Sequence, residues 1–475
     1  MATLGSIISF LGTRMASLLE NRILASFSQF IKQKTYPTQG WLTIQLALLV
    51  LLPYVFLAIL PMDNKGIYVE ILSFLNLVMM LSMMLQFPLA ARLKHAKLFS
   101  RIDWNMQQHK RMGKWIGVFF FLHPLLILLP KWLLSNADLR LSIIESITAP
   151  RLLTGIIAWV LLAVWVLSSI YKNKLPIAYD KWKLWHTAGF MVVLILATWH
   201  ITQVGSHGQF GQYINLLWWS ACFLSLAFTV YGYAIKPKLL SQHACTLVSR
   251  EKVSFNDWLI TLKTHSAFTF QPGQFVWLST KTSAYELDYH PFSIASTPRS
   301  LPNLSFVIRE LGDYTRSLEQ LKPGQAVFVD GPYGNMTLAA NDASNAIILI
   351  ASGVGIAPII GLLRALAEAN DPRPIRLIYG NRTYSQMLFT EELAHFENTL
   401  NNFKTRFVCY LPSTFAIYYQ GFIDQTCLQS ALQDVPVETS SVYLCGSDIA
   451  VKNIRKGLKQ FPIPARNIHF EQLSF

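Results

Sequence analysis

Long apolar runs fill the first half of the chain, and shorter alternating runs fill the second half. Six of the long runs approach the roughly 20 residues that a bilayer requires, so they predict membrane-spanning helices. These spans are residues 41–60, 67–91, 115–134, 152–171, 185–203 and 214–235. Apolar residues at helical spacing predict an amphipathic helix over residues 1–40 that lies on the membrane surface, with a plain cytosolic arm as the alternative.

The pattern changes after Pro237. Short β-rich runs broken by Pro and Gly predict a small antiparallel β-barrel. From Ala346 onward, runs such as AIILIA and IRLIYG alternate with helical stretches, which is typical of an α/β doubly wound domain with a parallel sheet. The expected domains are the terminal helix (1–40), an α-helical six-span membrane bundle (41–238), the barrel (239–340) and the α/β domain (341–475).

The net charge of +14 is better explained by a membrane topology than by a nucleic-acid-binding site. Residues 92–114 hold seven Lys or Arg and residues 172–183 hold four, whereas four in all lie in or beside the three connections on the other side. Because Lys and Arg accumulate on the cytoplasmic side, this bias predicts a multi-pass protein of the plasma or inner membrane, with both termini in the cytoplasm. The five cysteines form no CxxC pair, which argues against zinc and iron–sulfur sites.

Two pairs of histidines accompany the third and fifth spans. His109 and His123 are 14 residues apart, and so are His186 and His200. Fourteen helical residues rise about 21 Å and fall about 40° short of four turns, so both rings leave one face of the helix. Since both spans run outward, His109 would meet His186 at the inner level and His123 would meet His200 at the outer level. Each pair suits the two axial positions of a haem iron, whereas four unrelated membrane histidines are the alternative.

Two motifs in the predicted barrel suit a flavin. The run YHPFSIAST follows a strand and offers the aromatic face of Phe292 and the hydroxyl of Ser293 to a ring. The run VIRELGDYT presents Arg309, the Gly312 backbone and Thr315, a set that can hold a pyrophosphate.

Three features of the α/β domain suit a nicotinamide nucleotide. The run SGVGIAP, with Gly353, Gly355 and Pro358, connects a strand to a helix, where backbone amides and the helix N-terminus favour phosphate. Arg382 follows the next strand, where a ribose 2′-phosphate would bind, with a merely exposed arginine as the alternative. Cys445 closes a further strand at the carboxyl edge, where ligands bind in such folds, and a buried structural cysteine is its alternative.

Together these motifs resemble those of the ferric reductase and NADPH oxidase superfamily, over nearly the whole chain from Trp41. The resemblance implies a six-span di-haem membrane domain fused to a ferredoxin–NADP reductase-type module. It implies that His290, Pro291, Phe292 and Ser293 form the first flavin motif, with His290 near the pyrophosphate, Phe292 on the isoalloxazine and Ser293 near N5. It also implies that Cys445 and Gly446 lie beside the nicotinamide and that the terminal Phe475 covers the flavin.

The function implied is an NAD(P)H oxidase or ferric reductase-type enzyme. Its cofactors would be FAD, two haem b groups and NADPH or NADH, with Ser293, Cys445 and Phe475 nearest the chemistry. Electrons would cross the membrane to a small acceptor, either O2 or a ferric chelate, with no role for nucleic acid. Two alternatives stay open: an electron-donor module that feeds a partner protein, and a transporter or channel with a regulatory soluble domain. The acceptor and the oligomeric state stay undetermined by the sequence.

Overall fold

The structure is a computed structural model that describes residues 39–58, 66–93, 99, 101–134, 138–204, 212–338, 343–412 and 418–471. Phe475 lies outside these ranges, and so does the amphipathic helix predicted for residues 1–40 apart from its last two positions.

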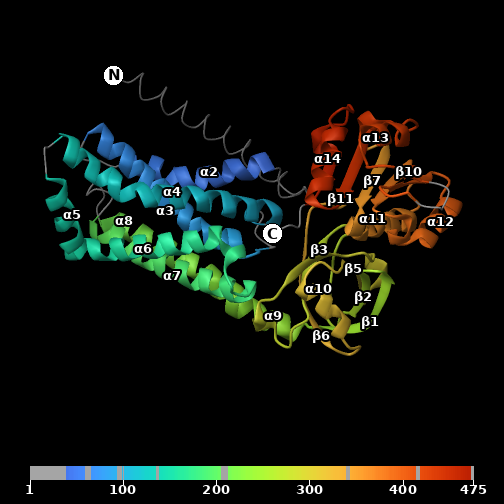
Figure 1. Ribbon diagram of the computed structural model, residues 1–475, viewed down its shortest axis with the longest axis horizontal. Coiled ribbons are helices and arrows are strands. Elements are labelled where there is room, and N and C mark those ends of the chain that lie inside the picture. Colours follow the sequence, from blue (N-terminus) through green and yellow to red (C-terminus); the bar gives the residue numbers. More distant parts are fainter. Residues whose placement is uncertain are drawn as a thin grey trace, which may run out of the picture. The chain divides into compact units, whose positions relative to one another are not determined.

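Long helices make up the first half of the described chain (Figure 1). They are α2 (Gln39–Ala58), α3 (Ile67–Ala90), α4 (Ile102–Leu134), α5 (Leu139–Thr148), α6 (Pro150–Ile170), α7 (Tyr179–Val204) and α8 (Gln212–Val230). Within the described residues, five helical stretches are long and apolar enough to cross a membrane, and they lie at the last five predicted spans. The first predicted span lies in α2, whose described apolar part is only Gly40–Leu51. This first span, and with it the total of six, stays a prediction.

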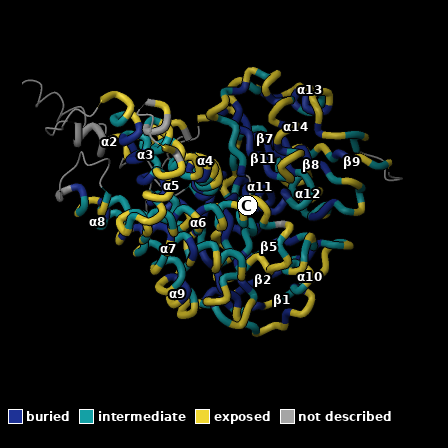
Figure 2. Tube along the Cα trace, turned by 60° about the vertical axis from the view of Figure 1, so that its left-hand side comes forward, coloured by how far each residue is buried: buried dark blue, intermediate teal, exposed yellow. Residues whose placement is uncertain are grey.

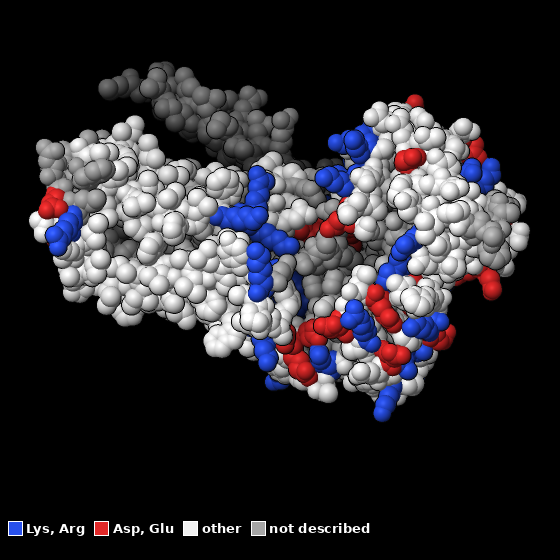
Figure 3. All heavy atoms as spheres, in the orientation of Figure 1, with Lys and Arg blue, Asp and Glu red and all other residues white. Residues whose placement is uncertain are grey.

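The outward surface of these helices is apolar. On α6, Leu153, Ile157, Val160, Val164 and Leu167 are all exposed, and their spacing of three or four residues places them along one stripe. Figure 3 shows the middle of the helical body almost free of charge, with most of its Lys and Arg atoms at one end and a smaller charged group, basic and acidic, at the other. A water-facing helix would carry charges on this stripe, so the helical half is built to be embedded in a membrane.

Several helix boundaries differ from the prediction because hydropathy marks the apolar run and not the end of the helix. Helix α4 begins at Ile102, so Lys110, Arg111 and Lys114 lie on a helix and not in a loop. The outer connection contains α5, whose first turn is capped by Asp138. The last span continues through a π-helical turn (Tyr231–Ile235) into α9 (Lys236–Gln242), which accommodates Pro237 in its first turn.

An antiparallel six-stranded sheet follows the helices. Its strands are β1 (Cys245–Ser254), β2 (Asp257–Lys263), β3 (Phe275–Ser279), β4 (His290–Ser293), β5 (Asn303–Arg309) and β6 (Ala326–Tyr333), in the order β4-β3-β6-β1-β2-β5. The two edge strands approach each other at one bridge, between Ile294 and Phe306. A single bridge does not establish a closed barrel, so the antiparallel sheet is observed and its closure stays a prediction.

A parallel six-stranded sheet makes up the last part of the described chain. Its strands are β7 (Ala346–Ser352), β8 (Ile375–Asn381), β9 (Phe403–Cys409), β10 (Tyr419–Gln420), β11 (Ser440–Cys445) and β12 (Ile468–Phe470), in the order β10-β9-β8-β7-β11-β12. Helices α11 (Ile356–Glu368) and α12 (Thr390–Thr399) pack on one face, and α13 (Gln425–Ala431) and α14 (Asp448–Leu458) pack on the other. The domain is therefore doubly wound, as predicted.

Burial follows from this layering. The central strands β7 and β11 are buried along almost their whole length, as their dark blue colour in Figure 2 indicates. Strand order reverses at β7, because β8 lies on one side of it and β11 on the other. In open α/β sheets the ligand crevice forms at this reversal, outside the carboxyl ends of the strands.

Candidate functional site

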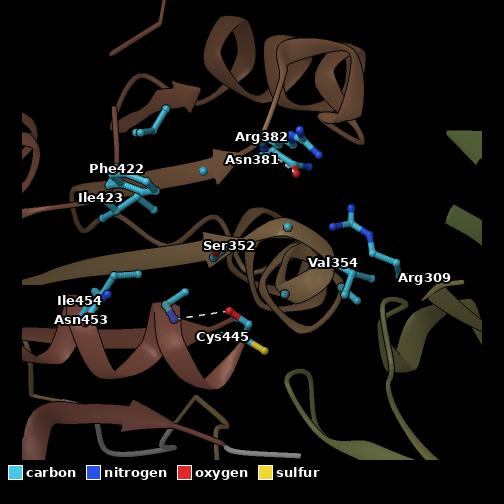
Figure 4. Close-up of a pocket in the computed structure, with 18 of the residues that line it drawn as sticks. Arg309, Ser352, Val354, Asn381, Arg382, Phe422, Ile423, Cys445, Asn453 and Ile454 are labelled. Atoms are coloured by element: carbon cyan, nitrogen blue, oxygen red, sulfur yellow. Dashed lines mark hydrogen bonds between the residues drawn. The ribbon is translucent and has the colours of Figure 1, made fainter. Parts of the chain in front are cut away.

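One cleft lies where the fold predicts it, at the carboxyl ends of the parallel strands (Figure 4). Its other wall is the antiparallel sheet, which carries the predicted flavin motifs and is called the flavin-type sheet below. It gathers residues from β4, β5, the loop after β7 and the end of β11. The predicted residues that line it are Pro291, Phe292, Ser293, Arg309, Thr315, Gly353, Gly355, Arg382, Cys445 and Gly446. Three predicted residues, His290, Gly312 and Pro358, are not among its lining residues.

Strand β4 presents the predicted first flavin motif with all four residues half-buried. The ring of Phe292 lies parallel to that of Tyr314, with centroids 6.1 Å apart and an interplanar angle of 18°. Tyr314 also contacts the His290 ring at a centroid distance of 3.9 Å. Sequence reasoning missed Tyr314, although it stands between Gly312 and Thr315 in a motif already singled out.

His290 is held by an acidic neighbour. Its Nε2 lies 2.7 Å from Asp288 Oδ1, and Lys281 Nζ lies 3.3 Å from the other carboxylate oxygen. Burial by itself raises the pKa of the Asp288 carboxyl, but His290 and Lys281 outweigh burial and hold this pKa below its ordinary value. His290 therefore faces a carboxylate at neutral pH.

Arg309 is fixed at the end of β5 by a buried partner. Asp257 is its register partner on β2, is fully buried, and accepts hydrogen bonds from Arg309 Nε at 2.8 Å and Nη2 at 3.0 Å. The guanidinium also approaches the loop after β7, where a Cβ on Gly353 would lie 2.9 Å from Nη1. Figure 4 shows Arg309 beside Val354 of that loop. The bidentate pair with Asp257 thus leaves a rigid cation at the wall shared by both halves of the cleft.

Thr315 shapes the loop that follows β5. Its hydroxyl oxygen accepts hydrogen bonds from the backbone N–H of Leu311 at 2.8 Å and of Gly312 at 3.0 Å. The same hydroxyl lies 2.9 Å from the Gly312 carbonyl oxygen, to which it donates. The Thr315 side chain therefore holds the loop beside Arg309 in a single shape.

The backbone of the glycine loop after β7 packs directly against the backbone at the end of β11. Gly353 has φ of +58°, a left-handed conformation that favours glycine. A Cβ on Gly355 would collide with the Cys445 carbonyl oxygen and would lie 2.8 Å from the Gly446 nitrogen. Pro358 is buried in the first turn of α11, so it packs behind the loop. Glycine at position 355 is what allows β7 and β11 to end side by side at the cleft.

Cys445 and Glu471 form a buried pair of acids at the same edge. Burial, with a contribution from the Glu471 carboxylate, raises the pKa of the Cys445 thiol to about 12. Burial and the Asp103 carboxylate raise the pKa of Glu471 to about 8, although the Asn335 and Met336 backbone N–H groups donate to it and oppose the shift. Glu471 therefore carries a proton at neutral pH beside the cleft. Sequence reasoning missed Glu471. The available signal was its position, because it directly follows the last strand at the carboxyl edge of the sheet.

Arg382 is exposed and lines the cleft just after β8. Its backbone N–H donates to Asn381 Oδ1 at 3.0 Å, and Figure 4 shows both side chains at the end of that strand. Its side chain is thus available to a ligand at the cleft.

The predicted inner histidines meet between α4 and α7. The ring centroids of His109 and His186 are 6.4 Å apart, and their planes cross at 64°. Two imidazoles on opposite sides of one metal ion have centroids about 6.4 Å apart, because each metal–nitrogen bond is about 2.0 Å long and each ring centre lies about 1.2 Å behind its nitrogen. His109 Nδ1 lies 3.3 Å from the Gln86 carbonyl oxygen, to which only an N–H can donate. This tautomer leaves the other ring nitrogen of His109 as a lone-pair donor, so His109 would be able to ligate a metal ion held between the two rings.

His186 has a comparable second contact, since its Nδ1 lies 3.0 Å from the Ser169 hydroxyl on α6. The outer histidines stand one level further along the same helices. His123 packs near Phe119, at a centroid distance of 6.1 Å. A Cβ on Gly155 of α6 would lie 2.5 Å from the His200 ring, so this glycine makes room for the imidazole.

Comparison with known protein families agrees with this geometry. Residues 71–197 match the ferric reductase like transmembrane component, residues 255–337 match an FAD-binding domain and residues 349–456 match the oxidoreductase NAD-binding domain. The chain therefore belongs with the ferric reductase-like proteins in which a transmembrane domain is fused to a ferredoxin reductase-type module. It is an NAD(P)H-dependent oxidoreductase, and the resemblance seen in its motifs is confirmed.

Individual relatives are more distant. The sulfhydrogenase 2 subunit gamma of Pyrococcus furiosus is 29% identical over 223 residues, which cover 45% of this chain and 74% of the relative. The reductase component of propane 2-monooxygenase from Mycolicibacterium goodii is 27% identical over 190 residues, 38% of this chain, and the chain spans about half (52%) of its length. The crystal structure of the Amycolatopsis cytochrome P450 reductase GcoB is similar over 49% of this chain and 69% of that chain, with 24% identity and a TM-score of 0.44.

Proposed function

We propose that the protein carries electrons from cytosolic NAD(P)H across a membrane to an acceptor on the far side. The observation that carries the proposal is the His109–His186 pair, whose 6.4 Å spacing fits one iron between the rings. His123 and His200 would hold a second haem at the outer level of the same helices. When bound, FAD and the haems supply the change from two-electron to one-electron transfer.

The chain's own residues position these groups. The Arg309 guanidinium and the loop ordered by Thr315 would hold the FAD pyrophosphate, and Phe292 would stack on the isoalloxazine with Ser293 near its N5. The glycine loop would bind the nicotinamide nucleotide's phosphates, with Cys445 and Gly446 beside the nicotinamide. Phe475, outside the described residues, would cover the flavin until the nicotinamide displaces it.

The direction of transfer follows from charge. Lys110, Arg111 and Lys114 are exposed at the end of α4 that carries His109. By the positive-inside rule this end faces the cytoplasm, with both chain termini and the nucleotide cleft. His109 and His186 would then be the inner pair, nearest the flavin.

The acceptor is tested with purified protein in lipid vesicles supplied with NADH or NADPH. Cytochrome c reduction that superoxide dismutase abolishes identifies O2 as the acceptor, with superoxide as the product. Reduction of a ferric chelate that is insensitive to the dismutase identifies iron. A protein without haem would refute the transmembrane route itself.

A second candidate is an electron-donor module for a partner protein. The observation that favours it is that matched relatives are named as a subunit and as a reductase component. Under this function the haems are reduced by NAD(P)H, yet neither O2 nor ferric chelate is turned over by the protein alone.

We expect Arg382→Ala to weaken NADPH binding more than NADH binding. The exposed guanidinium can pair with the 2′-phosphate, which NADH lacks, and such a charge-assisted contact contributes about 1.5–3 kcal/mol. The KM values for both nucleotides in flavin-level dye reduction measure the effect. Arg316→Ala, an exposed arginine that does not line the cleft, is the control. Equal weakening of both nucleotides would make Arg382 a structural residue.

A further inference from the structure

A carboxylate of the flavin-type sheet is buried against two cations from the membrane half. Asp330, on β6, has a side chain only 3% exposed. Its Oδ2 lies 3.2 Å from Arg92 Nη1, just beyond the end of α3, and 2.9 Å from Lys236 Nζ, at the start of α9. A buried charge requires close partners of opposite charge, and here both cations come from the membrane half.

Tyr333 completes what we call the Asp330 cluster, which consists of Asp330, Arg92, Lys236 and Tyr333. The Tyr333 hydroxyl lies 2.7 Å from Asp330 Oδ1 and accepts a hydrogen bond from Lys236 Nζ at 2.8 Å. Lys236 Nζ also donates to the Arg92 carbonyl oxygen at 3.1 Å. Arg92 has φ of +52°, a left-handed backbone that a residue with a side chain rarely adopts. Burial by itself raises the pKa of Asp330, but the two cations and the Tyr333 hydroxyl outweigh it, so the carboxylate is charged at neutral pH.

The cluster is linked to the flavin motif by residues paired in register on three adjacent strands, β6, β3 and β4. Asp330 is the register partner of Trp277 on β3, and Trp277 is the register partner of Pro291 on β4. The Arg92 guanidinium lies 4.8 Å from the centre of the Trp277 ring. Residues in register across adjacent strands move together, because the ladder hydrogen bonds hold them at fixed spacing.

The cluster is also linked to the inner histidines by α3. Gln86, on α3, accepts the hydrogen bond from His109, and Arg92 follows only six residues later. One short stretch of chain therefore touches both the inner histidine pair and the Asp330 cluster.

We propose that the Asp330 cluster positions the flavin strand against the membrane helices, and so sets the distance for electron transfer from the flavin to the inner haem. The proposal rests on the proposed function, since it assigns a positioning role within that route. Tunnelling falls exponentially with distance, so a small displacement of β4 relative to α3 slows this one step. The steps on either side, hydride transfer to the flavin and transfer between haems, do not cross the cluster.

The test is Asp330→Asn in the full-length protein in lipid nanodiscs. Flavin and haem absorbance are followed separately after anaerobic mixing with NADPH. We expect an unchanged rate of flavin reduction and unchanged FAD and haem contents, but haem reduction slowed by about tenfold or more, as misplacement of reacting groups produces. The control is Asp434→Asn, because Asp434 likewise joins an arginine and a lysine (Arg376 and Lys404) but within the parallel-sheet domain.

Tyr333→Phe keeps the test decisive if Asp330→Asn fails to fold, because it removes one hydroxyl and leaves both ion pairs. It should slow haem reduction in the same direction, by a smaller factor, with flavin reduction unchanged. Haem reduction at the wild-type rate in a folded Asp330→Asn protein, or in Tyr333→Phe if the first variant does not fold, overturns the proposal. A wild-type protein whose haems NADPH cannot reduce would instead refute the proposed function.

Discussion

His186→Leu should lower the haem content from about two per chain to about one and should stop transmembrane electron transfer. Leucine cannot ligate iron, so His109 would be the only remaining ligand for an inner haem. NAD(P)H-driven reduction of soluble dyes at the flavin should persist, because the cleft residues belong to the two sheet-containing domains. Haem absorbance per FAD, measured on the purified variant, gives the result directly.

Two further variants sharpen this experiment. His123→Leu should remove the outer haem alone, so that NADPH still reduces the inner one while far-side reduction is lost. His395→Leu replaces a histidine of α12, in the parallel-sheet domain, and should retain both haems. Full haem content in both membrane variants would mean that these histidines are not the ligands.

Gly355→Ala should lower NAD(P)H-driven flavin reduction by about a hundredfold, the scale that a misplaced binding loop produces. The added methyl would collide with the Cys445 carbonyl oxygen, so the glycine loop and the end of β11 must separate. The phosphate site and the residues beside the nicotinamide then lose their common geometry. Stopped-flow flavin reduction at a range of NADPH concentrations measures the loss.

Gly232→Ala is the matched control for this glycine. Nothing lies within 4 Å of the carbon that it would add, and Gly232 lies in the π-helical turn after α8 and does not line the cleft. FAD content and chemical reduction of the haems should be normal in both variants. If Gly355→Ala keeps the wild-type rate, the close approach of β7 and β11 does not govern nucleotide binding.

The local pattern of apolar and polar residues was sufficient to predict the helices and strands whose faces contact water, lipid or the core. The last five spans, the antiparallel strands and the alternation of strand and helix were all readable, because each depends on side chains a few residues apart. Helix ends were read less well. Helix α4 begins at Ile102 because its backbone hydrogen bonds continue through polar residues, which hydropathy does not count as helix.

Residues whose role depends on distant partners were missed. Asp257 lies 52 residues from Arg309 and meets it only because β2 and β5 pair in register. Asp330 lies 238 residues from Arg92, on a different element in a different half of the chain. No periodicity along the sequence connects such pairs, since their contacts are made by packing between elements.

By itself, the sequence determined the kinds of elements, their order and the chemistry placed on them: two pairs of histidines with the same 14-residue spacing, the motif HPFS after a strand, and glycines between strand and helix. The tertiary structure decided which of these groups meet. It placed the ring centroids of His109 and His186 6.4 Å apart, brought Arg309 close to the glycine loop, and buried Glu471 and Asp330 at contacts between separate elements. The physical reason is range, because helix and strand patterns repeat over a few residues, whereas burial and ion pairing depend on surfaces that only folding brings together.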